Sequence, residues 1–177
     1  MQLVGQTDPN QTVELLAPAL ERLARRHRFE WQIVTDSQGL CEIPQIPGVT
    51  TRAILWTDST EIEALGRFDI GVMPLRDEPW TRFKCGCKLI QYMAIGAAAV
   101  ASPVGVNSEI ADSGRAALLA ETSQDWETQL ERLLVSSTTR RELAVIARQR
   151  VAERYCLQAV FPAWLKAVLG ELDSVQK

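Results

Sequence analysis

The stretch FDIGVMPLRDEPWTRFKCGCKLIQYMAIGAAAVAS, residues 68–102, contains the pattern that decides the fold. Its first eight residues, Phe68 to Leu75, are mostly apolar with a proline near the end, which is typical of a buried strand. A helical pattern follows from Cys87 to Ile95, and a second apolar run from Ala98 to Ser102 predicts another strand. Strand, helix and strand in this order predict two parallel strands joined by a crossover helix.

The same alternation of apolar runs and helical patterns continues on both sides of this stretch. Four more strands are predicted, at Leu3–Gly5, Trp31–Val34, Ala53–Trp56 and Ala116–Ala120. Loops are expected over Asp36–Thr51 and through Pro79 and Trp80. The remaining helices are predicted at Gln11–Arg26 and Ser59–Gly66, from near Asn107, and at Asp125–Val135, Thr138–Arg154 and Leu157–Leu172. We therefore expect an α/β fold, a Rossmann-like parallel sheet of about six strands flanked by helices, with further helices at the C-terminus.

Size and composition limit the possible roles of the chain. Its 177 residues, 46% apolar and 23% charged, suit a single domain over residues 1–177. A net charge of -3 and a pI of about 5.3 argue against nucleic acid as the main partner. With neither a basic leader nor a long apolar run, the chain is expected to be cytoplasmic, with at most peripheral contact at the inner face of the membrane.

Metal-ligating and basic side chains give little further signal. The four cysteines are scattered apart from Cys85 and Cys87, and there is one histidine, so we expect reduced thiols and no zinc site. The basic run from Arg25 to Arg28 closes a predicted helix, where we expect a solvated face that complements the helix dipole.

Gly86 lies where a loop enters the helix that begins at Cys87. Free backbone N–H groups and the positive end of the helix dipole meet there, and Lys84 and Lys88 add two cations. A diphosphate is the natural ligand of such an arrangement, expected here beyond the carboxyl end of a parallel strand. The alternative is that both lysines are solvated residues at a helix start, and the spacing favours neither interpretation.

Two further groups are candidates for the same site. Gln91 lies three residues after Lys88 on the same helical face, from which an amide can reach ribose hydroxyls. The loop containing Gly105, Val106 and Asn107 ends a predicted strand and opens a helix, which brings a second helix N-terminus toward the ligand. Capping of that helix by Asn107 or Ser108 explains these residues equally well.

Residues 68–75, 79–96 and 100–107 together resemble the donor-binding region of the family 4 retaining glycosyltransferases of GT-B fold. The resemblance extends to LLAPALERLA at residues 15–24, to WETQLERLL at residues 126–134, and to the R-x-x-V-x-x-R-Y pattern at residues 148–155. It therefore covers nearly the whole chain in order. It implies the C-terminal, nucleotide-sugar-binding half of a two-domain enzyme, with the N-terminal acceptor domain absent from these residues.

The resemblance also assigns roles within the site. It implies transfer of a sugar from a nucleoside-diphosphate sugar to an unknown acceptor, without a metal or cofactor. Lys88 would be the catalytic residue, stabilising the leaving diphosphate together with Lys84. Two glutamates that the family carries eight positions apart map onto Phe83 and Gln91, and neither is a glutamate here.

Other departures weaken the expected donor binding. The segment GAAAVA at residues 96–101 replaces a family pattern that contains a proline, and the loop from Gly5 to Gln11 lacks the usual arginine and lysine. Two alternatives to a complete enzyme follow. The chain is a nucleotide-binding fragment that is inactive alone, or it is one subunit of a split transferase completed by a separate N-terminal domain or chain.

Overall fold

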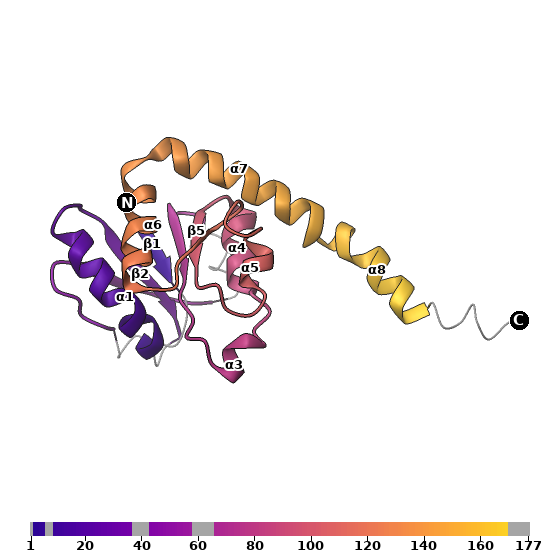
Figure 1. Ribbon diagram of the computed structural model, residues 1–177, viewed down its shortest axis with the longest axis horizontal. Helices are drawn as coiled ribbons and strands as arrows, with labels where there is room; N and C mark the ends of the chain where they lie inside the picture. Colours follow the sequence, from indigo (N-terminus) through magenta and orange to yellow (C-terminus); the bar gives the residue numbers. More distant parts are fainter. Residues whose placement is uncertain (1, 6–8, 37–42, 58–65, 170–177) are drawn as a thin grey trace, which may run out of the picture.

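The computed structural model describes residues 2–5, 9–36, 43–57 and 66–169 (Figure 1). Within them, six strands form one sheet in the order β3-β2-β1-β4-β5-β6, and every neighbouring pair is parallel. The strands are β1 Gln2–Gly5, β2 Glu30–Thr35, β3 Thr50–Leu55, β4 Ile70–Met73, β5 Ala98–Ala101 and β6 Leu118–Leu119. The expected parallel sheet of about six strands is confirmed.

Helices follow the strands as the crossover pattern requires. They are α1 Pro9–Ala24, α3 Pro79–Arg82, α4 Cys87–Ile95, α5 Asn107–Ile110, α6 Ser123–Val135, α7 Ser137–Arg154 and α8 Leu157–Leu169. The predicted helix at Ser59–Gly66 falls on residues outside the described ranges, apart from Gly66, which lies in a turn. Residues 170–172, predicted to end the last helix, are also outside them.

The two faces of the sheet carry separate groups of helices, because side chains alternate along a strand. Ile70 and Val72 of β4 pack with α1 and α6 in one apolar cluster. Met73, two residues from Gly71 on the opposite face, packs with α4 and α7 in a second cluster. At Gly71 the ring of Tyr92 comes so close that an added Cβ would lie 2.4 Å from its Cγ. This contact sets α4 directly against β4.

Several element boundaries differ from the sequence prediction. β3 begins at Thr50, inside the predicted loop, and β6 contains only Leu118 and Leu119. The loop predicted through Pro79 and Trp80 contains the one-turn helix α3, so that prediction is wrong there. Proline at the first helical position fixes φ near its helical value, and Thr81 closes the turn with its side chain.

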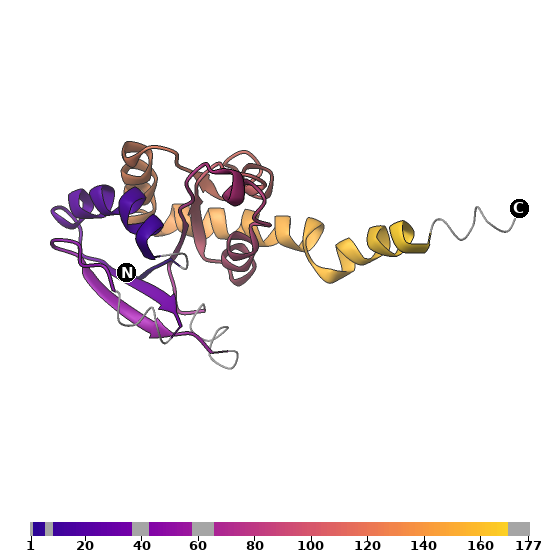
Figure 2. The same cartoon turned by 90° about the horizontal axis from the view of Figure 1, so that it is seen from below.

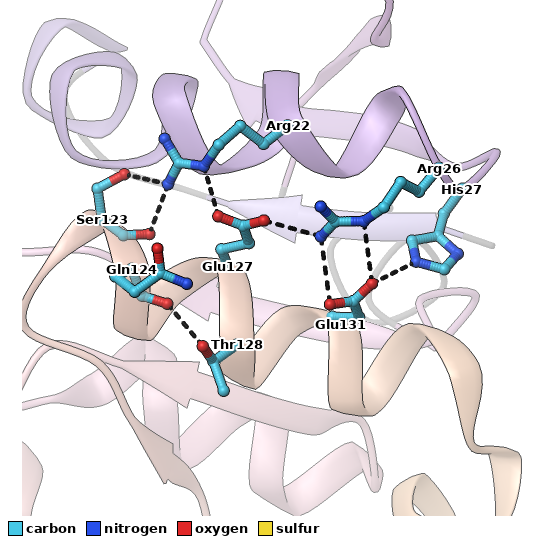
Figure 3. A network of polar contacts seen from close by, with 8 residues as sticks. All are labelled: Arg22, Arg26, His27, Ser123, Gln124, Glu127, Thr128 and Glu131. Atoms are coloured by element: carbon cyan, nitrogen blue, oxygen red, sulfur yellow. Dashed lines mark hydrogen bonds and ion pairs between the residues drawn. The ribbon is translucent and has the colours of Figure 1, made fainter.

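A network of ion pairs joins α1 to α6 (Figure 3). Arg22 and Arg26 both bind the buried carboxylate of Glu127, and Arg26 and His27 bind Glu131. The hydrogen bond from Arg22, followed by that from Arg26, holds the pKa of Glu127 below its usual range. The solvated face predicted for this basic run is therefore wrong at Arg26 and His27, which pair with a helix about 100 residues further along the chain.

α8 extends away from the α/β body beyond the end of α7 (Figures 1 and 2). Every residue from 161 to 169 is exposed, and Phe161 and Trp164 stack with ring centroids 5.9 Å apart. Its large exposed apolar residues are Leu157, Val160, Phe161, Trp164, Leu165, Val168 and Leu169. Among the described helices, none combines the length and the apolar character needed to cross a bilayer.

Candidate functional site

A pocket of about 470 Å³ opens between the end of β4, the α3 turn and the start of α4. It lies beyond the carboxyl end of a parallel strand, where ligands bind in open α/β sheets. Its lining consists of Met73, Leu75, Trp80, Phe83, Lys84, Cys85, Gly86, Cys87 and Lys88. Four residues predicted for the site, Phe83, Lys84, Gly86 and Lys88, are therefore brought together.

The segment between β4 and α4 is held by its own side chains. The hydroxyl of the buried Thr81 donates to the carbonyl of Arg76 and accepts a hydrogen bond from the Glu78 amide at 3.0 Å. Arg82 binds Asp77 through two nitrogens, with one Nη2 to Oδ2 distance of 2.9 Å. This hydrogen bonding lowers the pKa of Asp77. The turn that carries the aromatic side of the pocket is thus fixed at both ends.

Gly86 is buried and begins α4 in the left-handed conformation, with φ of 67°. A Cβ at this position would lie 2.2 Å from Cδ1 of Ile110, so both the backbone conformation and the packing favour glycine. The first turn of α4 contains no acidic residue. The helix dipole and the unpaired N–H groups of that turn therefore present positive potential at the pocket.

The pocket wall combines cations with exposed aromatic rings. Lys84 and Lys88 are half-buried and stand on either side of the α4 start. Trp80 is 76% exposed and Phe83 is 88% exposed, values that stand out for large aromatic side chains. Lysines and helix N–H groups suit phosphate oxygens, while flat rings suit stacking with a base or a sugar face.

The loop after β5 is built differently. Asn107 is 1% exposed, and its Nδ2 donates to the carbonyl of Ser102 at 3.0 Å, while Ser102 Oγ accepts from the Leu75 amide at 2.9 Å. The single-turn helix α5 begins after Val106 without a side-chain cap, so the predicted capping by Asn107 or Ser108 is wrong. The reason is that the Asn107 amide is used to tie β5 to α5.

Gly105 joins this loop to the pocket segment. Its φ is 58°, and an added Cβ would lie 2.5 Å from the carbonyl oxygen of Arg82. Gly105, Val106 and Asn107 stand outside the pocket lining, behind the α3–α4 segment. A ligand contact by these three residues stays a prediction.

Gln91 lies one turn along α4 from Lys88, half-buried and outside the pocket lining. The lining also includes residues that sequence reasoning did not select, namely Trp80, Cys85 and Cys87 with the apolar floor of Met73 and Leu75. A tryptophan in a turn-forming segment just before the Lys-Cys-Gly run was the available signal for Trp80. The floor residues gave no signal, because buried strand residues have the same sequence pattern whether or not a cavity lies above them.

A second hollow of about 210 Å³ shares Leu75 with the first. It lies between α1 and the loops after β4 and β5, where Arg76, Asp77 and Glu121 supply its charged groups. Among the described residues no cluster of three or more histidine, cysteine or acidic side chains is placed to hold a metal ion. The chemistry that these residues offer is therefore binding of an anionic, partly aromatic ligand at the 470 Å³ pocket.

Comparisons with known proteins agree with this architecture. Residues 2–136 match the family model described as glycosyl transferases group 1. No curated protein matches the chain. A solved C-terminal domain of a glycosyl transferase group 1 family protein (LpcC) from Francisella tularensis is 20% identical with a TM-score of 0.69, over 87% of this chain and 85% of that one.

Longer solved chains show the same fold over part of their length. Sucrose-phosphate synthase from Thermosynechococcus elongatus is 18% identical with a TM-score of 0.74, over 98% of this chain and 46% of that one. Anabaena Alr3699/HepE, solved in complex with UDP and glucose, is 16% identical with a TM-score of 0.69, over 94% of this chain and 47% of that one. The present chain thus spans about half the length of these two proteins.

Proposed function

Because the chain belongs to the glycosyl transferases group 1 family, we propose that its pocket binds the diphosphate of a nucleoside-diphosphate sugar. The observation that carries the proposal is the meeting of Lys84, Lys88 and the start of α4 at Gly86 in one 470 Å³ pocket. A diphosphate offers several anionic oxygens, which match two ammonium groups and a set of helix N–H donors. The exposed rings of Trp80 and Phe83 provide a surface for the base or the sugar.

The proposed reaction is transfer of the sugar to an acceptor with retention of anomeric configuration. When the bond from the anomeric carbon to the diphosphate breaks, negative charge develops on the departing phosphate oxygen. Lys88, helped by Lys84 and the α4 dipole, stabilises that charge in a fixed position, which is how a preorganised site lowers a barrier. In this proposal the chain's own cations, rather than a metal ion, balance the leaving group.

Transfer requires a second wall that supplies the acceptor. Since this chain spans about half the length of the longer solved proteins, we propose that an N-terminal acceptor domain or chain completes the cleft. The 177 residues alone then bind donor and transfer nothing. Transfer activity of the purified chain without any partner would contradict this part of the proposal.

A nucleotide-binding module without transfer activity is the second candidate. It is favoured by Phe83, which is 88% exposed at the pocket where the family resemblance implies a glutamate. A phenyl ring can stack on a ligand but cannot accept a hydrogen bond from a sugar hydroxyl. Under this hypothesis nucleotide binding persists in the completed protein while turnover is absent.

Calorimetric titration with UDP, GDP and ADP tests the donor site. One of these nucleotides is expected to bind, and Lys88→Ala is expected to weaken that binding by about tenfold or more, since charge-assisted bonds to phosphate are lost. Lys166→Ala is the matched control, because Lys166 is an exposed lysine on α8 outside the pocket lining. Equal affinity in the wild type and Lys88→Ala would overturn the assignment.

A completed enzyme separates the two candidates. Once a partner domain restores transfer, Lys88→Ala is expected to reduce kcat by about tenfold or more with a smaller change in KM, because its charge acts mainly on the leaving group. Nucleotide binding without detectable turnover in the completed protein would favour the binding module.

A further inference from the structure

Two free thiols stand on the wall of the proposed donor pocket. Cys85 and Cys87 flank Gly86, both are exposed, and both belong to the pocket lining. Cys156 has a different setting at the junction of α7 and α8. It is half-buried, and its Sγ donates to the Ala152 carbonyl at 3.0 Å. Reagents that enter the pocket therefore meet the first two thiols.

The immediate surroundings of these thiols are cationic. Lys84 precedes Cys85, Lys88 follows Cys87, and Cys87 is the first residue of α4, whose dipole is positive at that end. Positive potential in a concave site concentrates anionic reagents and raises their rate of encounter. A reagent that carries both a disulfide and carboxylates fits this combination of groups.

We propose that Cys85 and Cys87 form a thiol–disulfide exchange site for an anionic low-molecular-weight disulfide, and that its modification excludes nucleotide from the pocket. The second half of the proposal rests on the donor-binding function, whereas the first half does not. Glutathione disulfide is the probe, because its carboxylates can meet Lys84, Lys88 and the N–H groups of α4. These are the groups that the diphosphate would otherwise occupy.

The exchange step is a thiolate substitution. One cysteine, as its thiolate, attacks one sulfur of glutathione disulfide, so that a new S–S bond forms and the original S–S bond breaks. One glutathione leaves as a thiolate and takes up the proton that the cysteine released. The cysteine is oxidised to a mixed disulfide and half of the reagent is reduced, so no other oxidant is needed.

The bound glutathionyl group is large relative to its site. It is a tripeptide in a pocket of about 470 Å³, held covalently beside the cations that attract its carboxylates. A diphosphate would have to share both the volume and the charges. Nucleotide and the mixed disulfide are therefore expected to exclude one another.

Mass spectrometry of the full chain after exposure to glutathione disulfide tests the site. The tryptic peptide from Cys85 to Lys88 is expected to carry the mixed disulfide well before the peptide that contains Cys156. Lys84→Ala is expected to slow the modification, and a neutral disulfide is expected to be insensitive to that substitution. Faster modification of Cys156, or equal rates in Lys84→Ala and wild type, would overturn the exchange site.

A second measurement separates this proposal from the donor-binding one. The unmodified chain is titrated with UDP, GDP and ADP first, then again after modification and after reduction with dithiothreitol. Modification is expected to weaken nucleotide binding by about tenfold or more, and reduction is expected to restore it. Modified protein that binds nucleotide as well as the reduced protein would overturn the exclusion, while failure of the unmodified chain to bind would count against the donor site alone.

The variant Cys85→Ser with Cys87→Ser supplies the internal control. Whatever its own nucleotide affinity, exposure to glutathione disulfide is expected to leave that affinity unchanged. In Cys156→Ser, by contrast, the loss on modification is expected to equal that of the wild type. A loss that persists in the double variant would place the sensitive thiol elsewhere and overturn the proposal.

Discussion

The loops that follow β4 and β5 leave neighbouring parallel strands at the same edge of the sheet, yet they present opposite surfaces. The segment after β4 exposes Trp80 and Phe83 at 76% and 88%. The loop after β5 buries Ser102 and Asn107 at 3% and 1% and joins them by a hydrogen bond. One loop forms the wall of the pocket, and the other lies behind that wall.

The difference shows how the site divides exposure from support. Large exposed rings and cations are useful for binding but contribute little packing, so the segment that carries them needs a rigid neighbour. The β5 loop provides it through Gly105, which lies under the Arg82 carbonyl, and through Asn107, which lies near Gly86. Substitutions in the two loops should therefore act on different quantities.

Gly105→Ala is expected to have the largest effect. Its φ of 58° is unfavourable for alanine, and the new Cβ would lie 2.5 Å from the Arg82 carbonyl oxygen, a backbone atom. We expect a loss of about 2–4 kcal/mol in the free energy of unfolding and weaker nucleotide binding, because the pocket segment is displaced. Urea unfolding and calorimetry measure the two effects.

Gly114→Ala is the matched control for that substitution. Gly114 also has a positive φ, 96°, but an added Cβ would meet nothing within 4 Å. It is expected to lose about 1–2 kcal/mol of stability, from backbone strain alone, and to bind nucleotide normally. If Gly105→Ala behaved like Gly114→Ala in both measurements, the contact between the two loops would have no energetic role.

Asn107→Ala and Lys84→Ala form the next test, one in each loop. Removing the Asn107 amide leaves the buried Ser102 carbonyl without that donor, so we expect a loss of about 1–3 kcal/mol in stability. Lys84 is half-buried at the pocket, and its substitution is expected to change stability by less than about 0.5 kcal/mol while weakening nucleotide binding. Stability loss in Lys84→Ala with unchanged binding would reverse the assignment of the two loops.

Much of the fold was predictable from the sequence, because its signals are local and repeated. Apolar runs separated by helical patterns gave the parallel sheet, and α4 has the predicted bounds, Cys87–Ile95. α3 was missed because one helical turn has no periodicity to detect. It depends on Pro79 at its start and on the Thr81 hydroxyl, which bonds to the carbonyl of Arg76 across the turn.

The site was predictable only where its residues are contiguous. Lys84, Gly86 and Lys88 fall within five positions, so a helix start with two cations is visible in the sequence. The role of Gly105 was not visible, since it depends on a carbonyl 23 positions away in the chain. The Asn107 amide was assigned to a cap because cap and tie use the same residue types, and only the position of Ser102 distinguishes them.

The ion pair between Asp77 and Arg82 is expected to contribute the smallest effect, because both side chains are exposed. Its hydrogen bond holds the pKa of Asp77 below the usual range, so the stabilisation is present above an ordinary aspartate pKa of about 3.9 and is lost as pH falls through the lowered value. Asp77→Asn should therefore unfold at a slightly lower temperature than wild type at pH 7, and the two midpoints should converge near pH 2.

Direct titration gives a sharper measurement than the midpoints. In carboxyl NMR, Arg82→Ala should return the pKa of Asp77 toward its ordinary range, since the hydrogen bond from Arg82 is the largest cause of the shift. High salt should weaken the pair in the wild type, because exposed charges are screened. If the pKa of Asp77 stayed low in Arg82→Ala, the segment after β4 would be fixed by its backbone and by Thr81 instead, and its rigidity would no longer depend on a surface charge beside the pocket.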